Sequence, residues 1–413
     1  MLAQGDKIRV REAEEVGLLF LAWTFLRIGA TAFGGFMALV SVVQTIVVDR
    51  KKWLRTEEML DGVSLATILP GPVAINVVAY VGYKLRGGLG ALVCATAVVL
   101  PSFLLLVAFT IAYLEWGEIP VVDKALMGFI PAVAAIILNA AWGMRIKALG
   151  GWLEIVLAIL ACFLMILVGG FYLTLGIVLG AGGIGLLAFR RASPSAQDRD
   201  SGREPLPDAP GPPGSLLSWL IPSALLTLFL GLFVIRPPGI EASPPAELFV
   251  TFSGMSLMLF GGGFVFIPLI QEIVVDGLHW VSQAEFASAI ALGQITPGPI
   301  LISATFIGYK VYGLLGAFLA TFGIFFPPAL LMVTASRALD RINHSQLIQN
   351  ALRGIRAAVV GLIVAAAIVV GQSAAWDWAT LVIFLSTLVG LIRFKIDVAW
   401  LIPAAGLLGV LLH

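Results

Sequence analysis

The chain has 413 residues, of which 60% are hydrophobic and only 12% charged, and its mean hydropathy is +1.02. A soluble chain is nearer half apolar and a quarter charged, so most of this surface must face lipid. The formal net charge of +1 excludes a polybasic nucleic-acid-binding protein. Two cysteines and three scattered histidines make no disulfide framework and no metal-ligand spacing, so we expect no metal and no cofactor. Composition therefore predicts a polytopic membrane protein, all-α in fold, that is not an enzyme.

Residues 1–15 are polar and are predicted to form a cytoplasmic tail. The apolar stretch that follows has the outline of a signal peptide, with Ala30-Thr31-Ala32 in place of a cleavage site. However, the tail also carries three glutamates, and Arg27 interrupts the apolar run. We therefore expect this stretch to stay in the protein.

Nine apolar stretches are long enough to cross a bilayer, which takes about 20 residues. They are 89–113, 125–145, 152–168, 171–189, 217–235, 314–336, 352–371, 378–392 and 397–412. Four more stretches are apolar but interrupted by glycine or proline, namely 16–48, 59–83, 247–275 and 286–311.

Residues 192–215 are rich in proline, serine and alternating charges, and they predict a disordered cytoplasmic linker. The linker divides the chain into a first transporter repeat, 16–191, and a second, 216–413, which begins with an extra span at 216–235.

The two halves repeat one another. Residues 25–72 align without gaps onto 252–299, and sixteen of the aligned positions are identical. The identities include Gln44 with Gln271, Trp53 with Trp280, and both copies of Phe-Gly-Gly and Pro-Gly-Pro. Apolar sequence of low complexity aligns by chance, but shared tryptophan, glutamine and acidic residues are not explained that way.

Five predicted spans separate the two pairs of broken stretches, and an odd number predicts that the second half is inverted. Most basic clusters fall on one side if the broken stretches are re-entrant hairpins, whereas full spans would move Arg50-Lys51-Lys52 to the other side. We therefore favour hairpins. On this reading the N-terminus and the linker are cytoplasmic and the C-terminus lies outside.

Inverted repeats with Gly/Pro-broken helices in matching positions are typical of secondary transporters, whose site lies between the repeats. The turn Pro70-Gly71-Pro72 precedes a helix whose free N–H groups, from Val73 to Asn76, would face a cavity and attract an anion. Pro297-Gly298-Pro299 does the same for Ile300 to Ser303. Asn76 and Ser303 match, and each can donate a hydrogen bond. The alternative is that Pro-Gly-Pro is a kink and Gly-Gly a close helix contact.

Three cations are candidates for substrate charge. Arg27 lies deep in the first apolar stretch, and an intramembrane charge is by default a functional candidate. Lys84 and Lys310 match each other near helix ends. All three also have an ordinary alternative, in which the side chain extends to the lipid headgroups.

Four matching acids are candidates for proton coupling, because a carboxyl beside an apolar wall can be protonated near neutral pH. The alternative is helix capping or solvation at the membrane boundary. The four are Asp49, Glu58, Asp276 and Glu285.

The combination of Phe-Gly-Gly, Pro-Gly-Pro and Gly-Tyr-Lys in both halves resembles the long-chain, two-domain type of the chromate ion transporter (CHR) family. The resemblance covers nearly the whole chain apart from the tail and the linker. The matching motif positions are Phe33, Gly34, Gly35, Pro70, Gly71, Pro72, Gly82, Tyr83 and Lys84, and Phe260, Gly261, Gly262, Pro297, Gly298, Pro299, Gly308, Tyr309 and Lys310. Many family members continue the first Gly-Gly with proline, whereas Phe36 and Gly263 stand here.

This resemblance implies export of chromate across the plasma membrane, driven by the proton motive force, and hence chromate resistance. The residues alone predict a site for a small oxyanion, so sulfate or another oxyanion, or a passive anion channel, stay open as alternatives. The expected partners are the oxyanion, protons and the lipid bilayer, with no nucleic acid. A homodimer is left open, because the sequence does not decide the oligomeric state.

Overall fold

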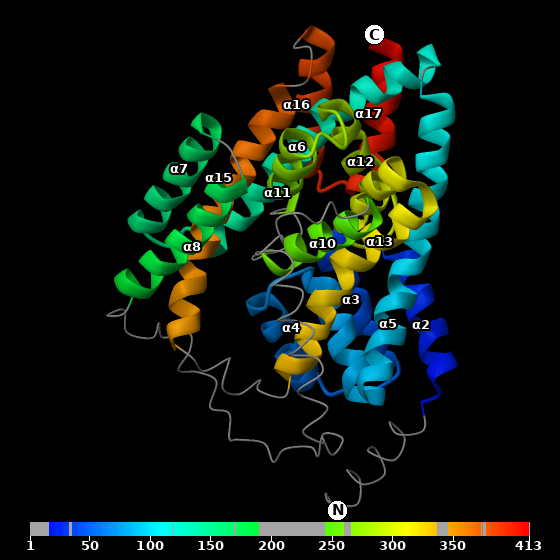
Figure 1. Ribbon diagram of the computed structural model, residues 1–413, viewed down its shortest axis with the longest axis vertical. Coiled ribbons are helices and arrows are strands. Elements are labelled where there is room, and N and C mark those ends of the chain that lie inside the picture. Colours follow the sequence, from blue (N-terminus) through cyan, green and yellow to red (C-terminus); the bar gives the residue numbers. More distant parts are fainter. Residues whose placement is uncertain are drawn as a thin grey trace, which may run out of the picture.

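The computed structural model describes residues 16–32, 35–117, 119–168, 171–189, 244–259, 266–336, 346–372, 374 and 377–412, and every regular element in them is a helix (Figure 1). Four of these helices are long and apolar enough to cross a membrane, at Val73–Trp116, Lys124–Arg145, Ser303–Ala335 and Gln349–Gln372. The predicted linker and the span predicted at 217–235 lie outside the described residues.

The duplication predicted from the sequence is visible as matching helices. In the first half they are α2 (Leu18–Thr31), α3 (Gly35–Gln44) with the π-helical turn η1 (Thr45–Arg50), α4 (Thr56–Ile68), α5 (Val73–Trp116), α6 (Pro120–Ala148), α7 (Trp152–Leu167) and α8 (Phe171–Ala188). In the second half they are α10 (Pro244–Leu257), α11 (Phe266–Gln271) with η5 (Glu272–Gly277), α12 (Gln283–Ile295), η6 (Ile300–Ile302) with α13 (Ser303–Ala335), α15 (Gln346–Gln372), α16 (Trp378–Ile392) and α17 (Val398–Leu412).

Irregular backbone is duplicated as faithfully as the helices. The turns after η1 and η5 place Lys52 and His279, which align, at φ values of 53° and 52°. The long helices α5 and α13 each break at aligned positions, where Gly87 and Gly313 have φ values of 62° and 57°. Matching conformations of this kind show that the repeat specifies backbone shape as well as hydropathy.

Each long helix is therefore two helices joined at a tight turn. A Cβ on Gly82 would overlap the carbonyl of Gly90, although residues eight apart in a straight helix are about 12 Å apart. Gly308 and Gly316 make the same approach. Only glycine leaves room for the chain to reverse so closely, so the first segments of α5 and α13 are short arms that fold back on a longer helix.

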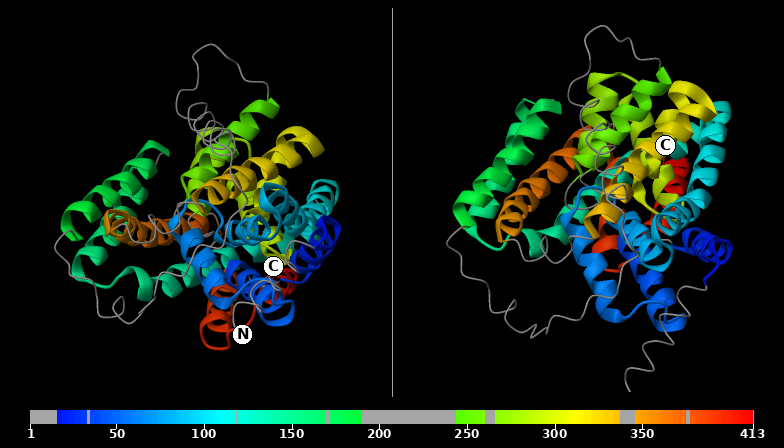
Figure 2. Two further views of the ribbon diagram at one scale, coloured as in Figure 1. Left: turned by 90° about the horizontal axis from the view of Figure 1, so that it is seen from below. Right: turned by 60° about the horizontal axis from the view of Figure 1, so that its bottom comes forward.

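The halves interlock. The long helix α5 packs against α13, and α15 packs against α6, α7 and α8. Conversely, α6 packs against α16 and α17, so the last two helices of each half pack against a helix of the other half. Figure 2 shows α15 beside α7 and α8 in both views. Glycine permits these crossings, because a Cβ on Gly128 would overlap the Ala405 carbonyl and one on Gly354 the Ala181 carbonyl.

Candidate functional site at the four helix breaks

The Pro-Gly-Pro turn of each half is hydrogen-bonded to the residue just before the Phe-Gly-Gly motif of the other half. The amide of Gly71 donates to the carbonyl of Leu259 at 2.7 Å, and the amide of Gly298 donates to the carbonyl of Ala32 at 2.9 Å. Leu259 and Ala32 directly precede the two Phe-Gly-Gly motifs. Each Pro-Gly-Pro turn is therefore held by the opposite repeat, and the four broken segments meet at the interface between the halves.

Glycine is required at the centre of both turns. The φ of Gly71 is +107° and that of Gly298 is +111°, values that other residues rarely adopt. A Cβ on Gly71 would overlap Pro328, and one on Gly298 would lie 2.5 Å from the hydroxyl oxygen of Ser102. Each turn is thus covered by a long helix of the other half. The Ser102 hydroxyl also donates to the carbonyl of Pro297.

The helices that start at these turns begin in buried surroundings. Pro72 takes the N-cap position of α5, and no side chain caps the helix. The amide of Asn76 donates to the Pro72 carbonyl at 3.0 Å, so it is not free as predicted. The first-turn amides that lack an acceptor within the helix are those of Val73 to Ile75. The amide of Ile302 likewise bonds to Pro299 at 3.1 Å.

Asn76 and Ser303 are fully buried at these helix starts. The side-chain nitrogen of Asn76 donates to the Pro70 carbonyl at 3.2 Å, whereas its Oδ1 has no hydrogen-bond partner. The hydroxyl of Ser303 also has none. Unsatisfied buried polar atoms are rare in folded proteins, and beside a helix N-terminus they indicate a binding site.

The Phe-Gly-Gly positions are only partly visible. Phe33, Gly34, Phe260, Gly261 and Gly262 lie outside the described residues, and Gly35 is the first residue of α3. Their part in the site stays a prediction.

The predicted cations lie apart from the turns. Arg27 is exposed on α2, with its guanidinium carbon 5.0 Å from the centre of the Trp23 ring. Lys84 is exposed near the end of the first arm of α5, 5.7 Å from the centre of the Tyr80 ring. Lys310 forms an ion pair with Glu285. None of these three contacts involves a residue of the Pro-Gly-Pro turns.

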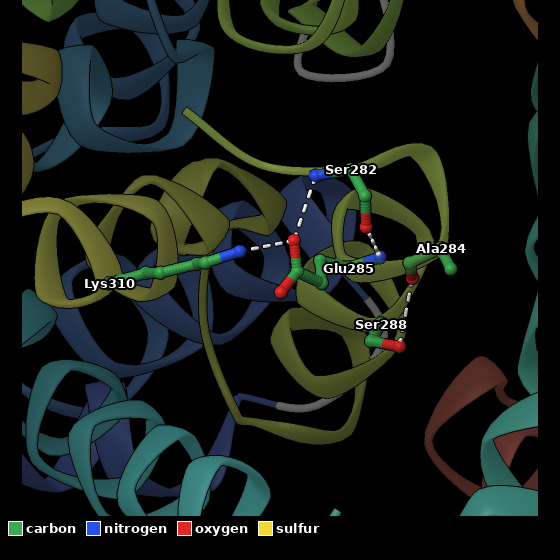
Figure 3. Close-up of polar contacts among 5 residues, drawn as sticks. All are labelled: Ser282, Ala284, Glu285, Ser288 and Lys310. Carbon is green, nitrogen blue, oxygen red and sulfur yellow. Dashed lines mark hydrogen bonds and ion pairs between the residues drawn. The ribbon is translucent and has the colours of Figure 1, made fainter. Parts of the chain in front are cut away.

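Glu58 and Glu285 cap helices. The Glu285 carboxylate accepts from the Ser282 amide at 2.8 Å, while the Ser282 hydroxyl accepts from the Glu285 amide, and Lys310 completes the cluster (Figure 3). Burial alone would raise the pKa of Glu285, but Lys310 and the bonds with Ser282 outweigh it and lower that pKa. Glu58 accepts from the Arg55 amide at 2.9 Å.

The aspartates occupy a different setting. Asp49 and Asp276 are exposed near the ends of the π-helical turns η1 and η5, before the loops that lead to α4 and α12. The Asp276 side chain is partly covered by its neighbours, and this partial loss of solvent raises its pKa, although nearby His279 acts in the opposite direction. Proton coupling at Asp49 and Asp276 stays a prediction.

Sequence reasoning missed Ser102 and Pro328, which cover the two turns. They stand at matching positions, directly after the matching prolines Pro101 and Pro327. Their alignment after the matching prolines was visible in the repeat, but a serine aligned with a proline looks like random divergence. It also missed the buried Glu154, which pairs with Arg353 of the other half at 2.6 Å and helps to join α7 to α15.

The helices, their apolar lengths and the interlocked halves define a multi-pass membrane protein, and buried helix starts between two repeats are typical of transporters rather than enzymes. The family model described as chromate transporter matches residues 19–186 and 246–410. The chain belongs to the chromate transporter family.

Relatives match over nearly their whole length. A chromate transport protein of Cupriavidus metallidurans is 29% identical over 98% of this chain and 95% of its own. A chromate transport protein of Pseudomonas aeruginosa is 28% identical over 93% of this chain and 90% of its own. An uncharacterized transporter of Methanocaldococcus jannaschii is 30% identical over 92% of this chain and 90% of its own. No solved structure gives a significant match.

Proposed function

We propose that this protein exports chromate across the plasma membrane, coupled to the proton motive force, and so confers chromate resistance. The observation that carries the proposal is the reciprocal bonding of the four helix breaks, which brings two buried, uncapped helix starts to the interface between the repeats. A tetrahedral oxyanion needs several donors around one point, and backbone N–H groups at the positive ends of helix dipoles meet that need.

The binding site of this proposal comprises the breaks and their neighbours. Backbone donors would hold the oxygens, Asn76 and Ser303 would add side-chain contacts, and the three cations would supply charge along the path. The residues assigned to the site are Phe33, Gly34, Gly35, Pro70, Gly71, Pro72, Asn76, Gly261, Gly262, Pro297, Gly298, Pro299, Ser303, Arg27, Lys84 and Lys310.

In the same proposal the two repeats are inverted in the membrane. In Figure 1 the long segment of α5 runs from the lower to the upper part of the molecule, and the long segment of α13 runs the opposite way, which supports inversion. The arms that precede these segments lie in the lower and upper parts respectively, as re-entrant hairpins would. The bias of basic clusters supports a cytoplasmic N-terminus and linker and an external C-terminus.

Export suits the energetics of an anion. A negative cell interior favours exit by about 2.3 kcal/mol per charge per 100 mV. Modest proton coupling is therefore sufficient, and Asp49, Glu58, Asp276 and Glu285 are its candidate carriers.

Uptake of labelled chromate into everted membrane vesicles tests this function, with and without an uncoupler and with sulfate as competitor. We expect uptake that collapses with the uncoupler and resists excess sulfate. Uptake that survives the uncoupler would indicate a passive anion channel, and ready displacement by sulfate would indicate a general oxyanion carrier. Either result would reject the proposal as stated.

A further inference from the structure

We infer that the site binds its oxyanion in the singly protonated form, and that Asn76 selects that form. This inference rests on the proposed function and deepens it, because it specifies the chemical state of the substrate and a residue that discriminates between oxyanions of similar shape.

The orientation of the Asn76 amide is fixed by its neighbour. The Pro70 carbonyl can only accept a hydrogen bond, and the side-chain nitrogen of Asn76 lies 3.2 Å from it. The reversed amide would bring two acceptor oxygens together, so the atom left without a partner is the acceptor Oδ1.

This free acceptor sits among donors. Asn76 is fully buried, and its nitrogen is 3.5 Å from where a Cβ on Gly71 would stand, so the side chain folds back over the turn. The first-turn amides of α5 follow directly after the same Pro-Gly-Pro turn. In the other half, Ser303 aligns with Asn76, and its hydroxyl has no hydrogen-bond partner. The two helix starts therefore offer first-turn amides as donors, the Ser303 hydroxyl, which can donate or accept, and the Asn76 Oδ1, which can only accept.

A fully ionised oxyanion cannot satisfy that acceptor. Its oxygens carry lone pairs only, so one of them beside Oδ1 would leave both atoms unpaired and repelling. A singly protonated oxyanion places its O–H on Oδ1 and its other oxygens on the amides. Sites built to bond a substrate hydroxyl reject analogues that lack it.

The preference separates chromate from sulfate on chemical grounds. Hydrogen chromate loses its proton near neutral pH, so a substantial fraction of chromate carries a proton in the cell. Hydrogen sulfate and hydrogen selenate lose theirs in strong acid and are fully ionised under the same conditions. Tetrahedral shape alone does not distinguish these ions, whereas an obligate acceptor does.

Titratable groups also lie on the helices that begin at the turns or pack against them. They are Arg27 on α2, Asp49 on η1, Glu57, Glu58 and Asp61 on α4, Tyr80, Tyr83, Lys84 and Arg86 on α5, Glu285 on α12, and Tyr309 and Lys310 on α13. Their titration would alter the binding of every oxyanion alike. Selenate, which has no proton to lose over this pH range, therefore serves as the internal control.

Equilibrium dialysis of the purified full-length protein against chromate and against selenate, between about pH 5.5 and 8.5, tests the inference. We expect the apparent affinity for chromate to fall by about tenfold per pH unit above the point where hydrogen chromate ionises, because one bound proton gives that slope. Selenate should bind weakly throughout. Equal binding of selenate, or chromate binding that does not change with pH, would overturn the inference while leaving chromate transport intact.

The variant Asn76→Ser replaces the obligate acceptor by a shorter hydroxyl that can also donate to an ionised oxygen, so it should reduce the preference for chromate over selenate by about tenfold. Asn139→Ser on α6 makes the same change at an asparagine outside both turns; it is the matched control and should leave the preference unchanged. An unaltered preference in Asn76→Ser would overturn the assignment of Asn76. Absence of chromate binding to the wild type at every pH would instead overturn the proposed function.

Discussion

The two glycines at the centres of the Pro-Gly-Pro turns combine an unusual φ with tight cover from the opposite half. An added Cβ at Gly71 would be strained by about 1–2 kcal/mol from φ alone and by about 1–3 kcal/mol more from overlap with Pro328. Gly313 has a positive φ too, but nothing lies within 4 Å of its Cβ position.

We therefore predict that Gly71→Ala lowers the thermal unfolding midpoint of the purified protein clearly more than Gly313→Ala does. Gly298→Ala should be intermediate, because the Ser102 hydroxyl can rotate away whereas the Pro328 ring cannot. Equal losses in the three variants would mean that the turns are not covered as described.

The ion pair between Glu285 and Lys310 can be separated from the capping role of the same carboxyl. Glutamine also completes a capping box, so Glu285→Gln keeps the cap and removes only the charge. We expect a loss of about 1 kcal/mol, since both side chains are partly exposed. Glu58→Gln is the matched control, with a smaller loss expected, because its partner Arg55 is 42% exposed and 3.7 Å away.

The pH dependence gives this prediction its sign. The pKa of Glu285 is lowered in the folded protein, so its contribution is present above the ordinary pKa of a glutamate and is lost as pH falls through the lowered value. The unfolding midpoint of Glu285→Gln, measured across acidic pH, should converge with that of the wild type at the lowest pH. A wild-type advantage that persists there would contradict this assignment.

At the scale of elements, the π-helical turns carry matching aspartates near their ends, before the loops that lead to α4 and α12. If Asp276 carries a coupling proton, Asp276→Asn should abolish chromate uptake driven by an imposed pH gradient in proteoliposomes but spare chromate–chromate exchange, which needs no net proton movement. Asp397→Asn, a loop variant between α16 and α17, is the control. Gradient-driven uptake that survives in Asp276→Asn would place the proton carrier elsewhere.

Hydropathy predicted most helices within a few residues, because each apolar run ends at charges or at glycine and proline. Residues 152–168 were predicted and α7 covers Trp152–Leu167; 378–392 were predicted and α16 has the same bounds. The Gly/Pro breaks were likewise visible as interruptions in apolar runs.

The contacts between the breaks could not be read from the sequence. The repeat aligns Pro-Gly-Pro with Pro-Gly-Pro. The backbone hydrogen bond from Gly71 to Leu259, however, depends on how the halves pack, and a backbone bond does not require a particular residue type at Leu259. The ion pair of Lys310 was missed for a related reason, because it depends on how the first arm of α13 packs against the start of α12, which residue type does not reveal.

At the scale of the whole molecule, each half needs the other to cover some of its helices, although α2 packs on α5 and α10 on α13 within their own halves. Helix α6 is covered by α16 and α17, and α15 by α7 and α8. An uncharacterized transporter of Bacillus subtilis is 32% identical to this chain over 93% of its own length but only 39% of this one, so single-repeat relatives exist.

We predict that a chain divided within 192–215 restores chromate resistance to a sensitive host when both pieces are co-expressed, whereas either piece alone gives none and is degraded. Protein level and resistance would be measured together. A single piece that is stable and active would contradict the interlocked arrangement.

The central claim is that the Pro-Gly-Pro turns build the anion site. Its most direct test is chromate transport in proteoliposomes by Pro70→Ala with Pro297→Ala, compared with Pro131→Ala and Pro403→Ala, which alter prolines inside α6 and α17. We predict that the turn variant is inserted at wild-type levels but does not transport, while the control variant transports. Near-normal transport by the turn variant would contradict the claim.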